Sequence, residues 1–94
     1  MEKSKRIVDK DMIKYVMQKP CLCCGKVPSV AHHVKTRGAG GGDTLDNLMP
    51  LCWMHHGQLH YEGYAKMIDK HIEIAYWLIE HDRTDILMKI GKLE

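Results

Sequence analysis

The 94-residue sequence predicts a small α+β protein whose thin hydrophobic core is reinforced by bound metal. Three observations lead to this prediction: two short pairs of metal-ligating residue types, a glycine-rich stretch between them, and helical periodicity on both sides. The composition fits one globular domain, because 45% of the residues are hydrophobic, 28% are charged, and no repeat or low-complexity tract is present.

The N-terminal residues are highly charged, and no apolar run follows them. They do not have the pattern of a signal peptide, and no window of the sequence reaches the ~18 apolar residues of a transmembrane helix. We therefore expect a cytoplasmic protein that has no membrane partner. In a reducing cytosol the four cysteines are expected to bind metal rather than to form disulfides.

Charge is unevenly distributed along the chain. Residues 1–40 hold nine Lys or Arg against three Asp or Glu, a net +6, whereas residues 41–94 hold five against nine, a net −4. A basic half next to a candidate metal site favours an anionic partner. The alternative is a solvated basic surface without a binding role.

The first predicted element is a helix over residues 8–19, which Pro20 ends. Its apolar side chains recur at helical spacing: Met12, Ile13, Val16 and Met17. After a cysteine-rich turn, the valine-rich residues 27–35 are expected to be extended. The stretch TRGAGGGD, residues 36–43, is predicted to be a loop, because its four glycines favour neither a helix nor a central strand.

Three helices are predicted in the second half of the chain. Pro50 stands at a natural helix start, so residues 51–61 are expected to form a short helix that carries three histidines. Residues 64–82 are predicted to form an amphipathic helix, and Asp82 or Thr84 is expected to cap a final helix after it. The inward positions are predicted to be Ile72, Ala75, Leu78 and Ile79, then Ile86, Leu87, Ile90 and Leu93. Trp53 and Trp77 are expected in the core rather than on a base-stacking surface.

The most specific motif is formed by two short pairs that a folded insert separates. Cys21 and Cys24 have C-x₂-C spacing. Cys52 and His55 have C-x₂-H spacing. Such pairs are typical of a closed tetrahedral zinc site, whose ~2.3 Å Zn–S bonds tie distant segments together. The surplus Cys23 could replace Cys21 or Cys24, although those two have the better spacing. The alternative is a set of free buried cysteines.

Once His55 is assigned to zinc, four histidines remain near the motif: His32, His33, His56 and His60. His56 and His60 are four residues apart, so on a helix they share one face with Cβ atoms ~5–6 Å apart and can bind one ion. His55 points elsewhere, toward the position three residues before it. The adjacent His32 and His33 can supply a third ligand and a base if the strand ends or is distorted there.

The order of these motifs resembles that of the HNH (ββα-metal) endonuclease family. AHHVKTRGAGGGDTLDNLMPLC-x₂-HH-x₃-H is similar to the phage and prophage group with an HH…GGxD…PLCxxHHxxxH pattern, which is related to recombination-enhancement nucleases. The match covers residues 21–63. It implies a ββα-metal core with a zinc knuckle over residues 20–63. The helix at 8–19 and the helices within 64–94 flank this core in one nuclease domain, residues 1–94.

The resemblance also implies a role for each matched residue. His33 would be the general base, and Asn47 would orient this base or brace the loop. His55 would take the place of the usual fourth cysteine at the zinc. The implied ligand sets are His32, His56 and His60 for a catalytic metal, and Cys21, Cys24, Cys52 and His55 for the structural zinc.

On this resemblance we expect a metal-dependent DNA endonuclease of low sequence specificity that serves phage or prophage recombination or processing in a bacterial or phage-infected cell. It would use structural zinc and a second divalent ion (Mg, Mn, Ni, Co or Zn), as a monomer or a homodimer. Lys35 and Arg37 flank the glycine run and are the expected phosphate contacts. The alternative is a non-catalytic zinc-binding module that binds nucleic acid. A thiol redox protein is disfavoured, because no βαβ pattern surrounds the cysteines.

Overall fold

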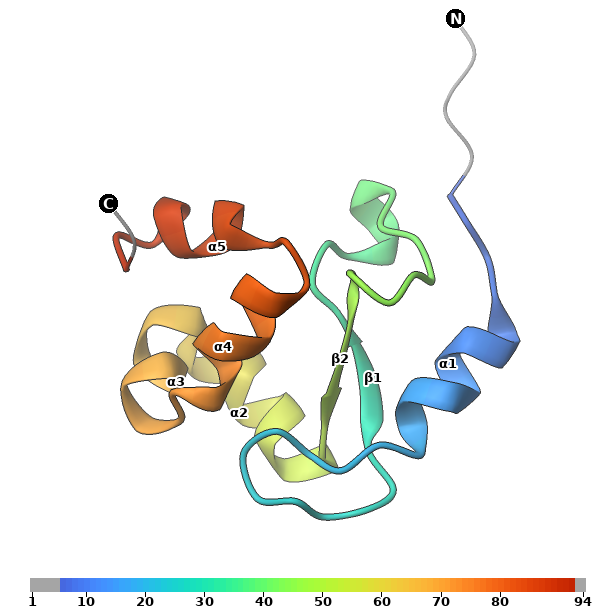
Figure 1. The fold of residues 1–94 in the computed structure, drawn as a ribbon, viewed down its shortest axis with the longest axis horizontal. Coiled ribbons are helices and arrows are strands. Elements are labelled where there is room, and N and C mark those ends of the chain that lie inside the picture. The colour runs from blue at the N-terminus through green and yellow to red at the C-terminus, as the bar shows by residue number, and fades with distance from the viewer. Residues whose placement is uncertain (1–5, 93–94) are drawn as a thin grey trace, which may run out of the picture.

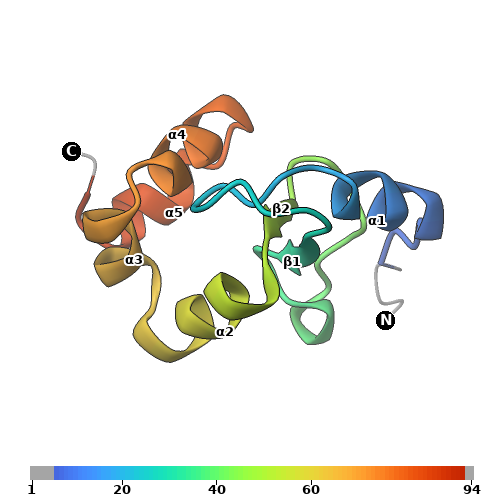
Figure 2. The ribbon, with the colours of Figure 1, turned by 90° about the horizontal axis from the view of Figure 1, so that it is seen from below.

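A two-stranded antiparallel sheet lies at the centre of the computed structural model, which describes residues 6–92 (Figure 1). Helix α1 lies on one side of this sheet, and helices α2 to α5 are grouped on the other (Figure 2). The elements are α1 (Lys10–Met17), β1 (Val30–His33), the 3₁₀ turn η1 (Arg37–Ala39), β2 (Leu48–Leu51), α2 (Trp53–Glu62), α3 (Tyr64–Lys70), α4 (Glu73–Glu80) and α5 (Thr84–Lys89). The predicted small α+β architecture is confirmed at this level. Over the described residues, no helix has the length and apolar character needed to cross a membrane.

Helix α1 is shorter than the predicted 8–19. It begins after Asp9, whose carboxylate accepts a hydrogen bond from the Met12 backbone N–H at 3.0 Å and so caps the first turn. Val16 is the side chain of this helix that is fully buried against the sheet. The helix ends at Met17 with Gln18 as its C-cap, ahead of the predicted terminator Pro20; a proline disfavours the helical conformation of the residue directly before it, here Lys19.

The two strands pair from Val30 opposite Leu51 to His33 opposite Leu48. Pro50 lies inside β2, so its predicted place at a helix start is wrong. An extended strand accommodates the fixed φ of proline, and the Pro50 carbonyl accepts a hydrogen bond from the Leu22 N–H. Helix α2 begins two residues later, where the Cys52 side chain is the N-cap.

The glycine-rich connection between the strands contains one helical turn, which the sequence prediction excluded. Thr36 caps this turn by accepting a hydrogen bond from the Ala39 N–H at 3.2 Å, so a 3₁₀ turn forms despite the glycines. Gly41 is required by close packing, because a Cβ there would lie 1.8 Å from the Lys35 carbonyl oxygen. Asn47, which the resemblance expects to orient the base or brace the loop, lies directly before β2.

The predicted helix over residues 64–82 is broken at His71 into α3 and α4. His71 leaves the helical conformation, so the helical phase restarts and the inward face of α4 differs from the predicted one. Ile72 and Ile79 are half exposed, while the buried positions are Ile74, Ala75, Trp77 and Leu78. The last helix has Arg83 at its N-cap without a side-chain cap, so neither Asp82 nor Thr84 caps it.

The hydrophobic core lies between the sheet and helices α2 to α5. Its fully buried members include Met49, Leu51, Met67, Ile74 and Leu78. Leu87 is buried, and Ile86 and Ile90 pack against the core as predicted, while Leu93 lies outside the described residues. Trp77 is in the core as predicted. The prediction for Trp53 is wrong: α2 turns His55 and Leu59 inward, which places Trp53 on its exposed side.

Candidate metal centres

The first candidate centre joins the turn after α1 to the start of α2. Cys21 and Cys24 lie in the turn, Cys52 caps α2, and His55 is in its first turn. One ligand atom from each of the four residues lies within 4.8 Å of the others. Gly25 adopts a positive φ of 76° and donates its N–H to the Cys21 carbonyl at 2.8 Å, which turns the chain back toward the cluster.

The spacing of these atoms fits a tetrahedral zinc ion. Around zinc, two thiolate sulfurs lie about 3.8 Å apart, and a sulfur and a nitrogen about 3.5 Å apart. The Sγ atoms of Cys24 and Cys52 are separated by 3.8 Å. His55 Nδ1 lies 3.7 Å from Cys21 Sγ and 3.2 Å from Cys52 Sγ. Three sulfurs and one imidazole nitrogen form a donor set that zinc prefers, so this cluster could hold zinc.

Backbone N–H groups favour thiolates at two of these positions. Burial alone would raise the pKa of Cys21, but backbone hydrogen bonds, including one from the Cys23 N–H, lower it below its ordinary value. The pKa of Cys52 is lowered in the same way, by the N–H and side chain of His55. Burial and the nearby Cys21 raise the pKa of Cys23 to about 12, so this surplus residue stays a thiol. Its ligand atom lies within 4.8 Å of those of His55 and His71.

The second candidate centre is a triad of histidines from two elements. His32 is buried on β1, and His56 and His60 lie one turn apart on α2. The His56 and His60 Nε2 atoms are 3.1 Å apart, and the His32 ring centroid lies 5.1 and 5.2 Å from those of His56 and His60. Ligand atoms of all three lie within 4.8 Å of one another. Two nitrogens bound to one divalent ion lie about 2.9–3.4 Å apart, so the helical pair fits joint coordination.

Two of the triad histidines, His32 and His56, have lowered pKa values, which favour the neutral form that binds metal. Burial, with the positive charge that His56 and His60 would carry, lowers the pKa of His32 to about 3. Burial and His60 also lower the pKa of His56. Tyr64 shares a 2.9 Å hydrogen bond with His32 Nε2, and burial raises the pKa of this phenol, so it stays uncharged. Sequence reasoning did not identify Tyr64, because an isolated tyrosine gives no spacing signal.

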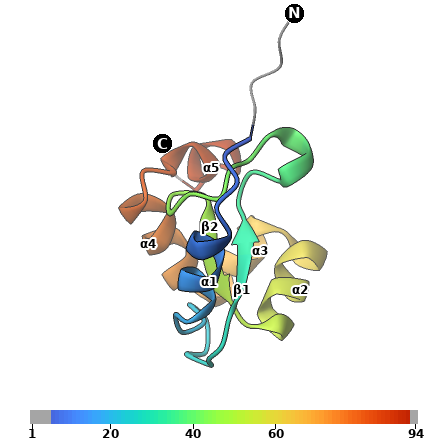
Figure 3. The ribbon, with the colours of Figure 1, turned by 90° about the vertical axis from the view of Figure 1, so that its right-hand side faces the viewer.

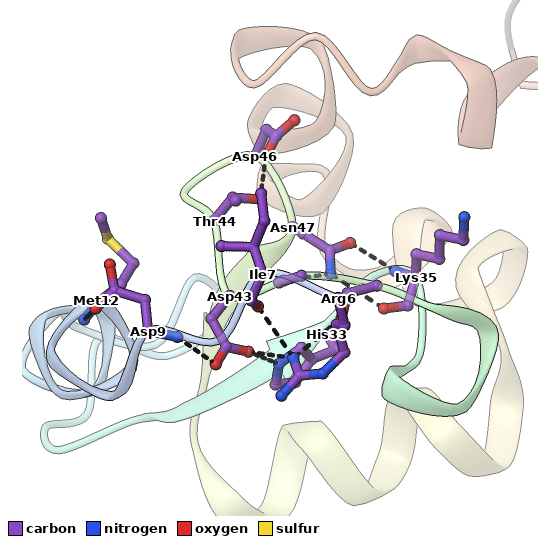
Figure 4. A network of polar contacts seen from close by, with 12 residues as sticks. Arg6, Ile7, Asp9, Met12, His33, Lys35, Asp43, Thr44, Asp46 and Asn47 are labelled. Carbon is purple, nitrogen blue, oxygen red and sulfur yellow. Dashed lines mark hydrogen bonds and ion pairs between the residues drawn. The ribbon is translucent and has the colours of Figure 1, made fainter. Parts of the chain in front are cut away.

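His33 ends β1 next to the triad, and its ring is held by a residue that the sequence prediction missed. Its Nε2 lies 2.8 Å from Asp43 Oδ1 (Figure 4). Because a carboxylate only accepts hydrogen bonds, Nε2 carries the hydrogen, so the lone pair of the neutral tautomer is on Nδ1. In the sequence, Asp43 is marked only by its position at the end of the GGGD stretch.

Asp43 is buried and ionised. Burial would raise the pKa of this carboxyl, but hydrogen bonds from His33, from the Asp9 N–H and from Arg6 hold it well below its usual range. The Arg6 guanidinium lies 2.7 Å from Oδ1, and the Asp9 nitrogen 2.9 Å from Oδ2. The carboxylate therefore joins the segment before α1 to His33.

Among the described residues, the Asn47 side chain makes no hydrogen bond to His33. Its side chain accepts a hydrogen bond from the Lys35 N–H at 2.7 Å and donates to the carbonyls of Lys35 and Gly42 at 3.0 and 2.9 Å. Two roles were expected for Asn47, and its hydrogen bonds fit the one in which it braces the loop. The residue that bonds His33 is Asp43.

The histidines open onto one pocket of about 470 Å³. It is lined by His32, His33, His56, His60, Thr36, Arg37 and the β1 residues Val30 and Ala31, with Gly38. Arg37 is exposed at this pocket, as a phosphate contact needs to be. Lys35 is exposed too, but it lines a neighbouring hollow with Asn47 and Arg83 instead. The two predicted phosphate contacts thus lie at different hollows.

Comparison with known proteins places these features in context. A family model described as "Protein of unknown function (DUF968)" matches residues 1–80. The uncharacterized protein YdfU of Escherichia coli (strain K12) is 34% identical over 68 residues, which cover 69% of this chain and 20% of that protein. The Type IV methyl-directed restriction enzyme EcoKMcrA of the same organism is 44% identical over 45 residues, which cover 48% of this chain and 15% of the enzyme. The chain thus spans a fifth or less of these relatives, and no solved structure matches it significantly.

Proposed function

The chain belongs to DUF968, a family of proteins of unknown function, and on this premise we propose that it is a metal-dependent nuclease that hydrolyses DNA phosphodiester bonds. The observation that carries the proposal is the convergence of His32, His56 and His60 beside His33 in one open pocket. A zinc knuckle alone has no use for three further imidazoles or for a histidine fixed by a buried carboxylate.

Two further observations support this proposal. The partial match to a restriction enzyme makes nuclease chemistry the natural candidate for a histidine cluster of this kind. The element order β1, connection, β2 and α2, with candidate ligands at the end of β1 and along α2, is also the order implied by the resemblance to the HNH (ββα-metal) family. We propose this family's chemistry for the chain.

In the proposed reaction His33 accepts a proton from the water that attacks phosphorus. Asp43 holds the hydrogen on Nε2 and fixes the ring, so the Nδ1 lone pair is available as the base. A divalent ion held by the histidine triad would neutralise phosphate charge and favour departure of the 3′ oxygen. Arg37, at the rim of the same pocket, would contact a phosphate of the bound strand.

Nicking of supercoiled plasmid by the zinc-loaded protein with added Mn²⁺ or Mg²⁺ tests the proposal. His33→Gln is the informative variant, because glutamine can still donate to the buried Asp43, but its amide is far too weak a base to take a proton from water. We expect wild-type protein to nick and His33→Gln to lose about two or more orders of magnitude in rate.

His81→Gln is the matched control for this experiment. His81 stacks on Trp77 on the C-terminal side of α4, outside the histidine pocket, so the same substitution there is expected to leave nicking unchanged. A folded wild-type protein that contains zinc but nicks with none of Mg²⁺, Mn²⁺, Co²⁺ or Ni²⁺ would overturn the enzyme proposal in favour of a non-catalytic nucleic-acid-binding module.

A further inference from the structure

Helix α2 presents a second row of side chains beside the histidine pair. Trp53, Gly57 and Tyr61 are spaced four residues apart, so they form one row along the helix. The row lies next to the one formed by His56 and His60 and extends about 12 Å along the axis. The two aromatic residues thus bracket the histidine pair, one before it and one after it.

Both aromatic side chains are left in solvent by the fold. Trp53 is 82% exposed and Tyr61 is 91% exposed, and Met54 beside Trp53 is also exposed. Helix α2 lies at the periphery of the molecule next to β1 (Figure 3). Tyr15 and Tyr76 are also exposed, at 53% and 58%, but Trp53 and Tyr61 are the two most exposed aromatic side chains and share one row of one helix beside the histidine pocket.

Gly57, between the two aromatics, is not explained by packing. Glycine inside a helix is destabilising relative to alanine. A Cβ at this position would meet nothing within 4 Å, so no neighbouring atom requires glycine there. Glycine leaves the helix backbone uncovered at this position between Trp53 and Tyr61.

The electrostatic surroundings favour an anionic ligand. Residues 53–61 contain no Asp or Glu. Lys26 lines a hollow of about 240 Å³ with Trp53, Met54, Pro28 and the candidate zinc ligands Cys24 and Cys52, and Arg37 lines the histidine pocket. Glu62, which follows Tyr61, is paired with Lys70 at 2.7 Å. An aromatic surface with cationic side chains at its edges suits nucleobases on a phosphate backbone better than it suits a protein partner.

We infer that Trp53 and Tyr61 stack on unpaired bases of the DNA strand whose backbone lies at the histidine triad, so that the preferred substrate is single-stranded or locally unpaired DNA. The bases of an intact duplex are stacked on one another and do not offer their faces to side chains, whereas unpaired bases do. This inference rests on the proposed function, because it names the substrate class of the same pocket.

The test compares binding of a labelled oligothymidylate strand and a labelled mixed-sequence duplex to zinc-loaded His33→Gln protein, which is expected to cleave them at least about 100-fold more slowly than wild type. We expect the strand to bind more tightly than the duplex. Trp53→Ala and Tyr61→Ala should each weaken binding of the strand by about fivefold or more and leave duplex binding unchanged. Trp53→Phe should restore most of the strand affinity, because phenylalanine also stacks.

Tyr76→Ala is the matched control for Tyr61→Ala, since Tyr76 is 58% exposed on α4, away from the row. It should leave both affinities unchanged.

Equal binding of strand and duplex, with no effect of Trp53→Ala, would overturn the inference even if plasmid is nicked. Self-association that depends on Trp53, without preference for the strand, would also overturn it and identify a contact between copies. If the wild-type protein does not nick plasmid but binds the strand more tightly than the duplex, only the nuclease proposal is contradicted.

Discussion

At the scale of single residues, Asp43 is the side chain on which the geometry of the proposed base depends. It is buried, and it receives hydrogen bonds from His33, Arg6 and the Asp9 backbone. Such a carboxylate acts on catalysis only through the histidine it orients, so it is a positioning residue. Its ionisation also contributes to folding stability.

Replacement of Asp43 by asparagine is expected to lower both nicking and stability. Activity should fall about 10- to 100-fold, because an amide does not fix the hydrogen on His33 Nε2 as a carboxylate does. The pKa of Asp43 is lower in the folded protein, so its charge stabilises the fold above the unfolded carboxyl pKa of about 3.9 and ceases to do so as the pH falls through the folded value.

Urea unfolding of wild type and Asp43→Asn as a function of pH measures this effect. The difference in unfolding free energy between them should be constant above about pH 5 and shrink at more acidic pH, because protonated Asp43 resembles asparagine. Acid-induced loss of zinc affects both proteins alike and cancels in the difference. A difference that grows toward acidic pH would contradict the account.

Sequence spacing was informative for residues whose chemistry depends on short-range pattern. The C-x₂-C, C-x₂-H and His-x₃-His pairs are set by one turn of chain or helix, and the structure brings each pair together. Asp43 and Tyr64 could not be found in this way, because 10 residues separate Asp43 from His33 and 32 separate Tyr64 from His32. Their contacts exist only once the sheet and α3 are assembled.

At the scale of elements, helix α2 carries three kinds of side chain on three faces. Its inner face supplies His55 to the knuckle and Leu59 to the core. The face toward β1 supplies His56 and His60, and its outer side carries the aromatic row. Helical geometry thus explains why adjacent histidines lie in two different clusters: their side chains point about 100° apart.

Two glycines at α2 are expected to respond oppositely to the same substitution. Gly57→Ala should stabilise the protein by about 0.5–1 kcal/mol, because it removes a helix-interior glycine and meets no neighbouring atom. Gly63→Ala should destabilise by about 1–3 kcal/mol, because Gly63 has a φ of 87°, which alanine adopts only with strain. Thermal unfolding of both variants measures this, and shifts of the same sign would contradict the assignment of the helix end.

The elements that sequence predicted least well are those set by tertiary contacts. The strand position of Pro50 depends on pairing with β1, and the break at His71 depends on how α3 and α4 fold over the core. Local hydrophobic periodicity predicts neither the strand position of Pro50 nor the break at His71. It does predict the presence of α1, whose apolar side chains recur at helical spacing within a few residues, although the helix is shorter than the predicted 8–19.

At the scale of the whole molecule, the candidate zinc site links chain segments that a small core alone holds weakly together. It joins the turn after α1 to α2, and α2 in turn carries two of the triad histidines. Zinc binding is then coupled to folding and to the geometry of the second centre.

Cys24→Ser tests this coupling, with Cys23→Ser as its control. Cys24 is exposed, so serine costs little packing, and a loss of stability reports the lost metal ligand. We expect Cys24→Ser to bind zinc weakly and to melt at a lower temperature, and Cys23→Ser to retain one tight zinc. Zinc analysis and thermal unfolding measure this; a Cys23→Ser protein without zinc would show that the surplus cysteine is the ligand.

The most direct test of the central claim, that the histidine triad holds the catalytic ion, is a Co²⁺ titration of zinc-loaded protein with plasmid nicking measured in the same samples. We predict one exchangeable Co²⁺ per chain beyond the tight zinc, nicking that saturates with occupancy of this site, and loss of both in His60→Ala. Cleavage that persists in His60→Ala without exchangeable Co²⁺, or occupancy without cleavage, would contradict the account.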